Sequence, residues 1–535
     1  MRRAHRIPLV SAPAPLPAAS DDAAIALPPD KFHRVLAGLL LVLALSSLDA
    51  NIVGPALPLI SSEFGALDSL TWVLTIFLLT STAATPLYGK LSDMYGRRPL
   101  LTIAVLLFLA GSAFSGLAQS MNQLILGRAI QGVGAGGLMT LTQITMSDLV
   151  SPRRRGSYQG LFGAVFTIAS LAGPPLGGVI AEFWSWRWIF YVNLPLGAAA
   201  LTLLWMGLPP GVRTTSHRID VLGFVVIMAA TSCVLMALNQ GSHGSWTSPI
   251  VISLAVAAVV LALLLGPIEA RAKEPLIPLA MVGNSVWLIA TGVATLVTIA
   301  VFGALAFMPL YLQLAGGLSP TASGIAMVPS AAGLMLSLLY GGRAITRTGR
   351  YKVFAVTGVG VATLALFALA LAAYALPSPY LLGALLFPLG AGLGLLMPGL
   401  TVAYQNAVAH EDIGTATSTA GFFRSLGGAF GIAVAGAILA MQAGGLLPAG
   451  GGAQDMDNIG LGQLSQLSPA AQAMVLADYQ WAMVTIFAAA GVVAALAFAL
   501  VRLLPEQELS DVANRPVSNA LESNPPGANP PGTKS

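Results

Sequence analysis

The sequence has little charge. Only 9% of its 535 residues are charged and 56% are hydrophobic, whereas about 25% of the residues of a soluble globular protein are charged. The mean hydropathy is +0.81. This composition excludes a soluble globular protein, so we predict an all-α polytopic membrane protein with the lipid bilayer as its main partner.

Cysteine and buried histidine are also scarce. A single cysteine, Cys233, excludes a disulfide framework and a cysteine-rich metal site, and it is most simply a small packing residue. No buried His/Glu set and no Ser or Asp dyad occurs at helical spacing. We therefore expect no metal, no cofactor and no enzymatic activity. All the histidines fall in tails, predicted loops or helix ends, namely His5, His33, His217, His243 and His410.

The hydrophobic residues form fourteen runs, each close to the length of about 20 residues that a membrane-spanning helix needs. An even number of spans places both chain ends on one side. The first thirty residues are rich in Pro and Ala and contain no signal-peptide core. The predicted spans lie near 35–58, 70–88, 99–118, 122–145, 158–181, 187–207, 219–239, 249–268, 285–313, 320–340, 352–375, 380–404, 414–440 and 482–503.

Basic residues are absent from six of the connections between these spans. With both ends inside, the inner loops include "GKLSDMYGRRP", "SPRRRGS" and "GGRAITRTGRYK", while Arg187 is the only basic residue on an outer connection. This asymmetry follows the positive-inside rule and predicts that both termini are cytoplasmic. Because the basic residues are explained in this way, the net charge of +4 does not indicate a nucleic-acid partner.

A short internal repeat divides the chain. "GKLSDMYGR" and "GRAITRTGR" each carry two glycines seven residues apart and a following arginine, after the second span of their half. Transporters are often built from repeated halves. Eight predicted spans separate the two copies, where two six-helix halves would give six, so two extra helices lie between the halves. The predicted domains are a disordered tail 1–34, a six-helix bundle 35–208, two linker helices 209–270, a six-helix bundle 271–504 with an outer loop 441–481, and a disordered tail 505–535.

One carboxylate lies deep inside a predicted span. Asp49 occurs in "LALSSLDANIVGPALP", where a charge costs roughly 2.5–3.5 kcal/mol on insertion scales. Arg128 lies at a similar predicted depth in the fourth span, so the two side chains can meet. One interpretation is a fixed ion pair that joins two helices. The other is a carboxylate that exchanges a proton, because burial disfavours its charged form and a nearby arginine favours it.

Several motifs resemble the major facilitator superfamily, and within it the fourteen-helix drug:proton antiporter family. They are "LDANIVGPALP" in the first span, the loop "GKLSDMYGRRPL", "RAIQGVGAG" in the fourth span, "AGPPLGG" in the fifth span, "WSWRWIFYVNLPLG" and "FMPLYLQLAGGLSPTASG". The resemblance extends from the first span to the last. It implies a proton-coupled exporter in which Asp49 carries the proton and Arg128 modulates it.

The resemblance gives the loop motif a gating role, and the residues suggest how. We interpret Gly89 and Gly96 as permitting a tight turn, and Asp93 as bonding backbone donors at a helix N-terminus. Arg97 and Arg98 can form ionic contacts that open and close. The alternative is a simple positive anchor at the inner surface.

Two departures weaken this motif as a charge network. Met94 stands where the family has arginine. In the second copy, Thr346 stands where the acid would be, so we interpret that copy as structural.

The fifth span carries the antiporter motif of the family. We expect Gly173, Gly177 and Gly178 to permit close helix packing, and Pro174 and Pro175 to remove backbone hydrogen bonds. The family role of sealing the bundle against a proton leak is compatible with packing.

The substrate site leaves only weak signals in the sequence. We expect it between the halves near the membrane midplane. Arg424 in the thirteenth span lacks a deep acidic partner; we favour contact with Asp93 or a carbonyl group, with an anionic group of the substrate as the alternative. The other candidates are polar or aromatic residues, each of which can instead be a packing residue: Asn51, Trp72, Gln131, Phe307, Tyr311, Gln313 and Tyr404.

These patterns predict a monomeric, multi-pass protein of the cytoplasmic membrane that exports amphipathic drugs or toxic compounds in exchange for protons. One alternative is export of an endogenous lipid, siderophore or metabolite. Another is a transporter-like receptor or scaffold that transports nothing, against which the costly buried acid argues.

Overall fold

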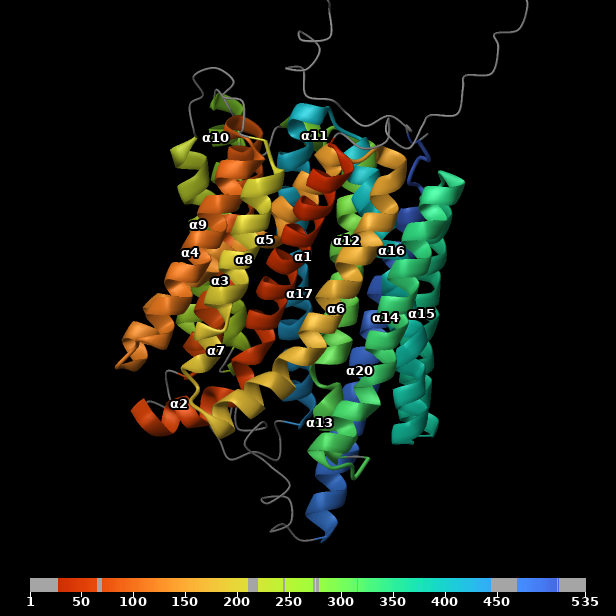
Figure 1. Cartoon of the computed structure of the whole chain (residues 1–535). Helices are drawn as coiled ribbons and strands as arrows, with labels where there is room; N and C mark the ends of the chain where they lie inside the picture. Colours follow the sequence, from red (N-terminus) through yellow and green to blue (C-terminus); the bar gives the residue numbers. More distant parts are fainter. Residues whose placement is uncertain are drawn as a thin grey trace, which may run out of the picture.

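The computed structural model describes residues 27–64, 70–209, 220–243, 246–272, 275, 279–314, 316–376, 378–443, 469–507 and 509. The secondary-structure elements in these residues are helices. Fourteen of the helices are long and apolar enough to cross a membrane, as the sequence predicts. They run side by side through the molecule (Figure 1).

The first half of the chain contributes six long helices and three short ones. Its long helices begin and end close to the predicted spans, although most extend further at one end or both. The elements are α1 (Pro29–Ile52), η2 (Gly54–Ala56), α2 (Leu57–Phe64), α3 (Leu70–Tyr95), α4 (Arg97–Gly116), α5 (Met121–Leu149), α6 (Pro152–Phe183), α7 (Trp188–Tyr191) and α8 (Asn193–Gly207).

Two helices follow and then the second half. The connecting helices are α9 (Val221–His243) and α10 (Pro249–Arg271). The second half contains α11 (Leu279–Val282), α12 (Ser285–Ala306), α13 (Met308–Leu314), α14 (Pro320–Thr348), α15 (Lys352–Ala375), α16 (Pro379–Asn406), η4 (His410–Asp412), α17 (Ile413–Ala443) and α20 (Pro469–Arg502).

Each half has its own hydrophobic core. One cluster of buried residues draws only on residues 32–208, and another only on residues 281–504. α9 and α10 pack on each other, and α9 also packs against both α3 and α17. The connecting helices therefore cover one side of the seam between the halves.

Several predicted boundaries are wrong by part of a helix. α1 begins at Pro29, inside the predicted tail, and α20 begins at Pro469, inside the predicted outer loop. α1 ends at Ile52, and the chain continues through η2 into α2, which points away from α1 (Figure 1). Pro55 lacks a backbone N–H and cannot continue the α-helix. Residues 1–26 and 510–535 of the predicted tails and the loop segment 444–468 lie outside the described residues.

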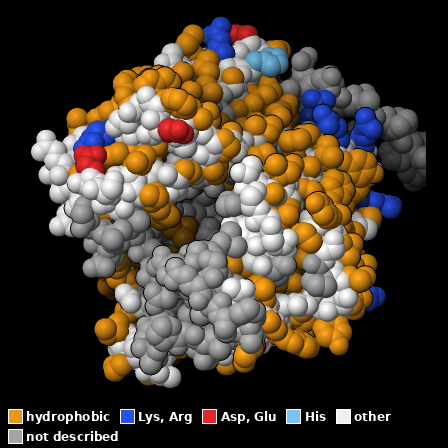
Figure 2. Space-filling view, turned by 90° about the horizontal axis from the view of Figure 1, so that it is seen from below, with side chains coloured by type: hydrophobic (Ala, Val, Ile, Leu, Met, Phe, Trp, Pro, Cys, Tyr) orange, Lys and Arg blue, Asp and Glu red, His pale blue; other side chains and the backbone are white. Residues whose placement is uncertain are grey.

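We call the face that carries the start of α1 and the end of α20 the inner face; it is at the top of Figure 1. The opposite, outer face is hollowed near its centre (Figure 2). Arg187, the basic residue on an outer connection, is paired there with Glu63 at 2.7 Å, and Glu63 also accepts a hydrogen bond from Trp186 Nε1 at 2.7 Å. This pairing neutralises the one predicted exception to the charge asymmetry.

The two halves touch through glycine at the inner face. A Cβ atom placed on Gly342 of α14 would lie 2.3 Å from the carbonyl oxygen of Gly156 in α6, and one on Gly89 of α3 would lie 1.9 Å from Ser418 Oγ in α17. Real Cβ atoms do not approach so closely. Only glycine allows these helices to meet, and their contact closes the inner face.

Glycine also joins α1 to α6 within the first half. A Cβ atom on Gly177 would lie 2.1 Å from the carbonyl oxygen of Ile52, and one on Gly173 would lie 2.8 Å from Asn51 Cβ. The neighbouring Gly178 has no atom within 4 Å of such a Cβ. The antiporter motif therefore contains two packing glycines and one that faces open space, on a helix that continues through Pro174 and Pro175.

We expect Gly177→Ala to destabilise the protein, because overpacking a close contact costs typically about 1–3 kcal/mol. Gly178→Ala is the matched control, since alanine favours a helix over glycine by about 1 kcal/mol and meets no clash there. The measurement is thermal unfolding of the purified protein in one detergent. Equal unfolding temperatures for the two variants would contradict the packing role of Gly177.

Candidate functional site

The carboxylate of Asp49 is fully enclosed by hydrogen-bond donors of the first half. Asp49 lies in the last turn of α1 and is 0% exposed. Its Oδ2 accepts a hydrogen bond from Arg128 Nη1 at 2.8 Å. Its Oδ1 accepts from Gln131 Nε2 and from Asn193 Nδ2, each at 2.8 Å. A buried charge needs such partners, because removing one member of a buried pair costs about 3–5 kcal/mol.

Arg128 is held in place by contacts on several sides. It is 0% exposed, and its Nη1 also donates to Gln131 Oε1 at 2.7 Å. Its guanidinium carbon lies 4.0 Å from the centre of the Phe77 ring, a cation–π arrangement. Arg128 and Gln131 are three residues apart on α5, so helical geometry places both side chains on the face toward Asp49.

Asn193 extends the network to α4. It is the first residue of α8, directly after the break that separates α7 from α8. Its Nδ2 donates both to Asp49 and to Ser112 Oγ, the latter at 2.9 Å, and Ser112 Oγ donates to the carbonyl of Phe190 at 2.8 Å. The network therefore joins α1, α4, α5 and α8.

Two buried polar atoms in this network have no hydrogen-bond partner among the described residues. They are Nη2 of Arg128 and Oδ1 of Asn193. Leaving a buried donor or acceptor unpaired costs about 1–3 kcal/mol. Each of these atoms can therefore form a further hydrogen bond.

The sequence predicted part of this network. Asp49 and Arg128 meet as their predicted depths allow. Gln131 was predicted as a cavity residue, but it is 0% exposed and bonds Asp49. Asn193 and Ser112 were not predicted from the sequence. Their only signal in the sequence was that they are polar residues within otherwise apolar spans, and only the folded chain shows that they share a network with Asp49.

The loop motif lies at the inner face, where Asp93 joins α3 to α17. Its Oδ1 accepts from the backbone N–H of Gly414 at 3.1 Å, and its Oδ2 accepts from that of Thr415 at 2.7 Å. A carboxylate is favourable at a helix N-terminus, where backbone N–H groups lack partners. The backbone donors that we predicted for Asp93 therefore belong to α17, a helix of the opposite half.

Of the other residues of the loop motif, one is paired with Asp93 and the others lie apart from it. Arg97 is paired with Asp93, and its Nε lies 2.7 Å from Asp148 Oδ2. Arg98 lies over the Trp205 ring of its own half at 5.4 Å, and its part in a gate stays a prediction. Met94 is buried.

The glycines of the motif have different roles. Gly96 has φ 88° and precedes α4, so it permits the predicted turn. Gly89 lies inside α3, so its predicted turn is wrong; it allows close approach to Ser418 instead.

The second copy of the motif also contacts the other half. Arg153 of α6 donates from Nε to the carbonyl of Thr346 at 3.0 Å and from Nη2 to that of Arg347 at 3.1 Å. These carbonyls end α14, where a cation complements the helix dipole. Thr346 Oγ1 also accepts from the backbone N–H of Ser157 at 3.2 Å. At the second copy, a cation therefore meets the C-terminal end of a helix of the other half, whereas at the first copy the anion Asp93 meets an N-terminal end. Both contacts lie at the inner face.

The remaining cavity candidates are dispersed. Tyr311 is 1% exposed and stacks on Tyr479 with ring centres 6.2 Å apart, and Tyr404 is buried with its hydroxyl donating to Thr401. Burial inside the second half excludes Tyr311 from a cavity wall in this conformation. The others are half-buried: Trp72, Phe307, Asn51, whose side chain donates to the Ser47 carbonyl, and Gln313, which donates to Ser323.

Arg424 does not contact Asp93, which corrects the favoured prediction. Its Nη2 lies 3.9 Å from Sδ of Met139 in α5, across the seam between the halves. Asp93 accepts from Arg97 and from the start of α17 instead.

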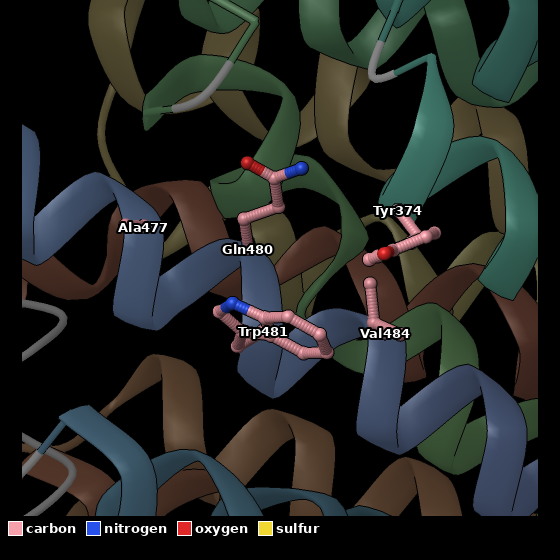
Figure 3. Close-up of a pocket in the computed structure, with 5 residues that line it drawn as sticks. All are labelled: Tyr374, Ala477, Gln480, Trp481 and Val484. Atoms are coloured by element: carbon pink, nitrogen blue, oxygen red, sulfur yellow. The ribbon is translucent and has the colours of Figure 1, made fainter.

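A small pocket on α15 and α20 is separate from these residues (Figure 3). Gln480 donates to the carbonyl of Ala373 at 2.7 Å, and the Tyr374 and Trp481 rings lie 5.5 Å apart. Both rings are more than half exposed, and Tyr374 lies in the last turn of α15. Such aromatic residues are typical of the membrane interface.

Comparison with known proteins agrees with this architecture. The Major Facilitator Superfamily model matches residues 39–432, and the chain belongs to this family of membrane transporters. The chain is 34% identical over 415 residues to the multidrug transporter protein MdtP of Bacillus subtilis, covering 77% of this chain and 76% of that protein. It is 32% identical over 412 residues to multidrug resistance protein 3 of the same organism, covering 76% and 79%.

Longer and structural matches extend the comparison. The chain is 34% identical over 508 residues to the uncharacterized MFS-type transporter Rv1877 of Mycobacterium tuberculosis, covering 94% of this chain and 74% of that protein. The human organic anion transporter MFSD10 superposes with a TM-score of 0.60 at 18% identity, covering 89% of this chain and 100% of that one. The proton:xylose symporter XylE gives 0.57 at 16%, covering 90% and 97%. At these identities the solved structures show the shared fold alone.

We expect Asp93→Ala to open the inner face, because a hydrogen bond to a charged group contributes about 1.5–3 kcal/mol and Asp93 accepts several. Spin labels on Tyr95 and Glu411, in a chain with Cys233→Ser, measure the separation of α3 and η4. Asp93→Ala should add a population at longer distance.

Arg98→Ala is the matched control, since Arg98 contacts Trp205 of its own half, and its distance distribution should equal that of the parent. A distribution for Asp93→Ala that also equals the parent's would show that Asp93 does not hold this face closed.

Proposed function

We propose that this transporter is a proton-coupled antiporter that exports amphipathic drugs or toxic compounds across the cytoplasmic membrane as a monomer. The observation that carries the proposal is the buried carboxylate of Asp49 with its three side-chain donors. The names of the relatives MdtP and multidrug resistance protein 3 support the substrate class.

The network suggests how a proton changes the structure. A charged Asp49 attracts Arg128 across 2.8 Å in a site from which water is excluded, where opposite charges interact much more strongly than in water. A proton on Asp49 removes that attraction and converts an acceptor into a donor. The unpaired Oδ1 of Asn193 can then accept from the protonated acid.

The position of the network links protonation to the rest of the molecule. Asp49 lies in the last turn of α1, and α1 packs on α6 through Ile52 and Gly177. α6 in turn contacts α14 at the inner face. In this inner-closed conformation the proton would enter from the outer side, and Arg128 would be released when it binds.

Proton coupling is tested in everted vesicles that hold a pH gradient. We expect addition of a transported lipophilic cation, anion or neutral drug to collapse the gradient with the parent protein and not with Asp49→Asn at matched expression. Asp30→Asn is the control, because Asp30 is exposed in the first turn of the same helix. Asp30→Asn should behave as the parent does.

If Asp49→Asn and the parent collapse the gradient alike, Asp49 is one member of a fixed ion pair and the proton is carried elsewhere. Thermal unfolding distinguishes the two roles further. A fixed pair predicts a lower unfolding temperature with unchanged proton release.

A further inference from the structure

Arg424 is a cation at the seam between the halves with no carboxylate within ion-pair distance among the residues that the structure describes. Its Nη2 lies 3.9 Å from the sulfur of Met139, and a thioether is only a weak acceptor. Arg424 is half-buried rather than enclosed. Its charge is therefore available to a further partner.

Arg424 lies near the middle of the membrane. α17 begins at Ile413, and a rise of 1.5 Å per residue places Arg424 about 16 Å from that end, roughly half of a hydrocarbon core of about 30 Å. Met139 lies at a similar depth, about 15 Å from the inner end of α5 at Leu149. The contact between them is therefore at the midplane and between the halves.

The described residues that the contacts place near this cation are neutral. One turn away on the same helix, a Cβ atom on Gly421 would lie 3.9 Å from both Thr140 Oγ1 and Thr85 Cγ2 of the first half. On the side of the second half, Tyr404 lies close enough to interact electrostatically with Arg424. These neighbours, three hydroxyl-bearing side chains and one thioether, carry no charge.

The deep and inner acids are engaged elsewhere. Asp49 bonds Arg128, which is about 16 Å from Met139 along α5. Asp93 bonds Arg97 and the start of α17 at the inner face. These acids therefore do not neutralise Arg424, and its positive charge attracts anions and repels cations.

We propose that Arg424 binds the acidic group of an amphipathic anion, such as a carboxylate or sulfonate, in the space between the halves. The inner face is closed by contacts between the halves, so the proposal takes the outer face, which is hollowed near its centre (Figure 2), as the side of access in this conformation. The claim that this anion is the exported substrate rests on the proposed function. The claim that Arg424 binds the anion does not depend on proton coupling.

The test uses a reporter cysteine beside Arg424. Cys233 is the only native cysteine, so Cys233→Ser gives a background without thiols, and Gly421→Cys adds one where there is room for a side chain. The full-length protein in nanodiscs is treated with a negatively charged sulfonatoethyl and a positively charged trimethylammonioethyl thiosulfonate. The reaction rate of each reagent with the reporter is divided by its rate with free cysteine, which removes the difference in intrinsic reactivity between the two reagents. Thr140→Cys provides a second reporter from the opposite helix.

We expect the sulfonate reagent to react at least about tenfold faster than the ammonium reagent, since opposite charges a few ångström apart in a protein interact by more than one tenfold step in free energy. Arg424→Gln should bring the ratio close to one, and Arg424→Lys should retain most of it. Octanesulfonate should protect the reporter at lower concentration than octyltrimethylammonium, which has the same alkyl chain.

Three results would overturn the inference: no reaction at either reporter, a ratio that Arg424→Gln leaves unchanged, or equal protection by the two amphiphiles. Asp49→Asn in the same background separates this inference from proton coupling. A sulfonate preference that survives Asp49→Asn, whatever the pH-gradient assay shows, supports the anion site independently. If the protein with an unchanged Asp49 shows proton release but no sulfonate preference, the anion site is rejected and proton coupling is not.

Discussion

The structure depends on the cost of placing charge and unpaired polar groups in a medium that cannot solvate them. Backbone groups in lipid must bond within the chain, so the described part of the chain is built from helices. The same cost makes Asp49 informative, because a charge in the bilayer is retained only with partners. Arg128, Gln131 and Asn193 supply these partners from two other helices.

Close backbone contacts at glycine residues hold the helices together. In lipid there is little hydrophobic force to join helices, so close approach of backbones contributes much of the association. Gly177 allows α6 to lie on α1, and Gly156 with Gly342 allows α6 to lie on α14. One helix thereby connects the acid-bearing α1 to the contact between the halves.

The inner face is closed by two contacts of opposite polarity. Asp93 of the first half meets the start of α17, and Arg153 of the first half meets the end of α14. Each charge complements the helix end that it contacts. Because these are polar contacts at the edge of the membrane, water can replace them when the halves separate, whereas the buried cores of the halves stay intact.

The sequence by itself determined the membrane class, the number of spans and the presence of a deep acid, because hydropathy and charge act locally along the chain. The depth of Asp49 and Arg128 was also predictable, since helix rise is constant. Which faces of the helices meet is a property of the packed bundle. Only the tertiary structure therefore revealed Asn193 beside Asp49, moved Gln131 from a cavity wall into the network, assigned Asp93 to α17 and placed Arg424 against Met139, because each of these contacts joins residues far apart in the chain through packing that no local pattern records.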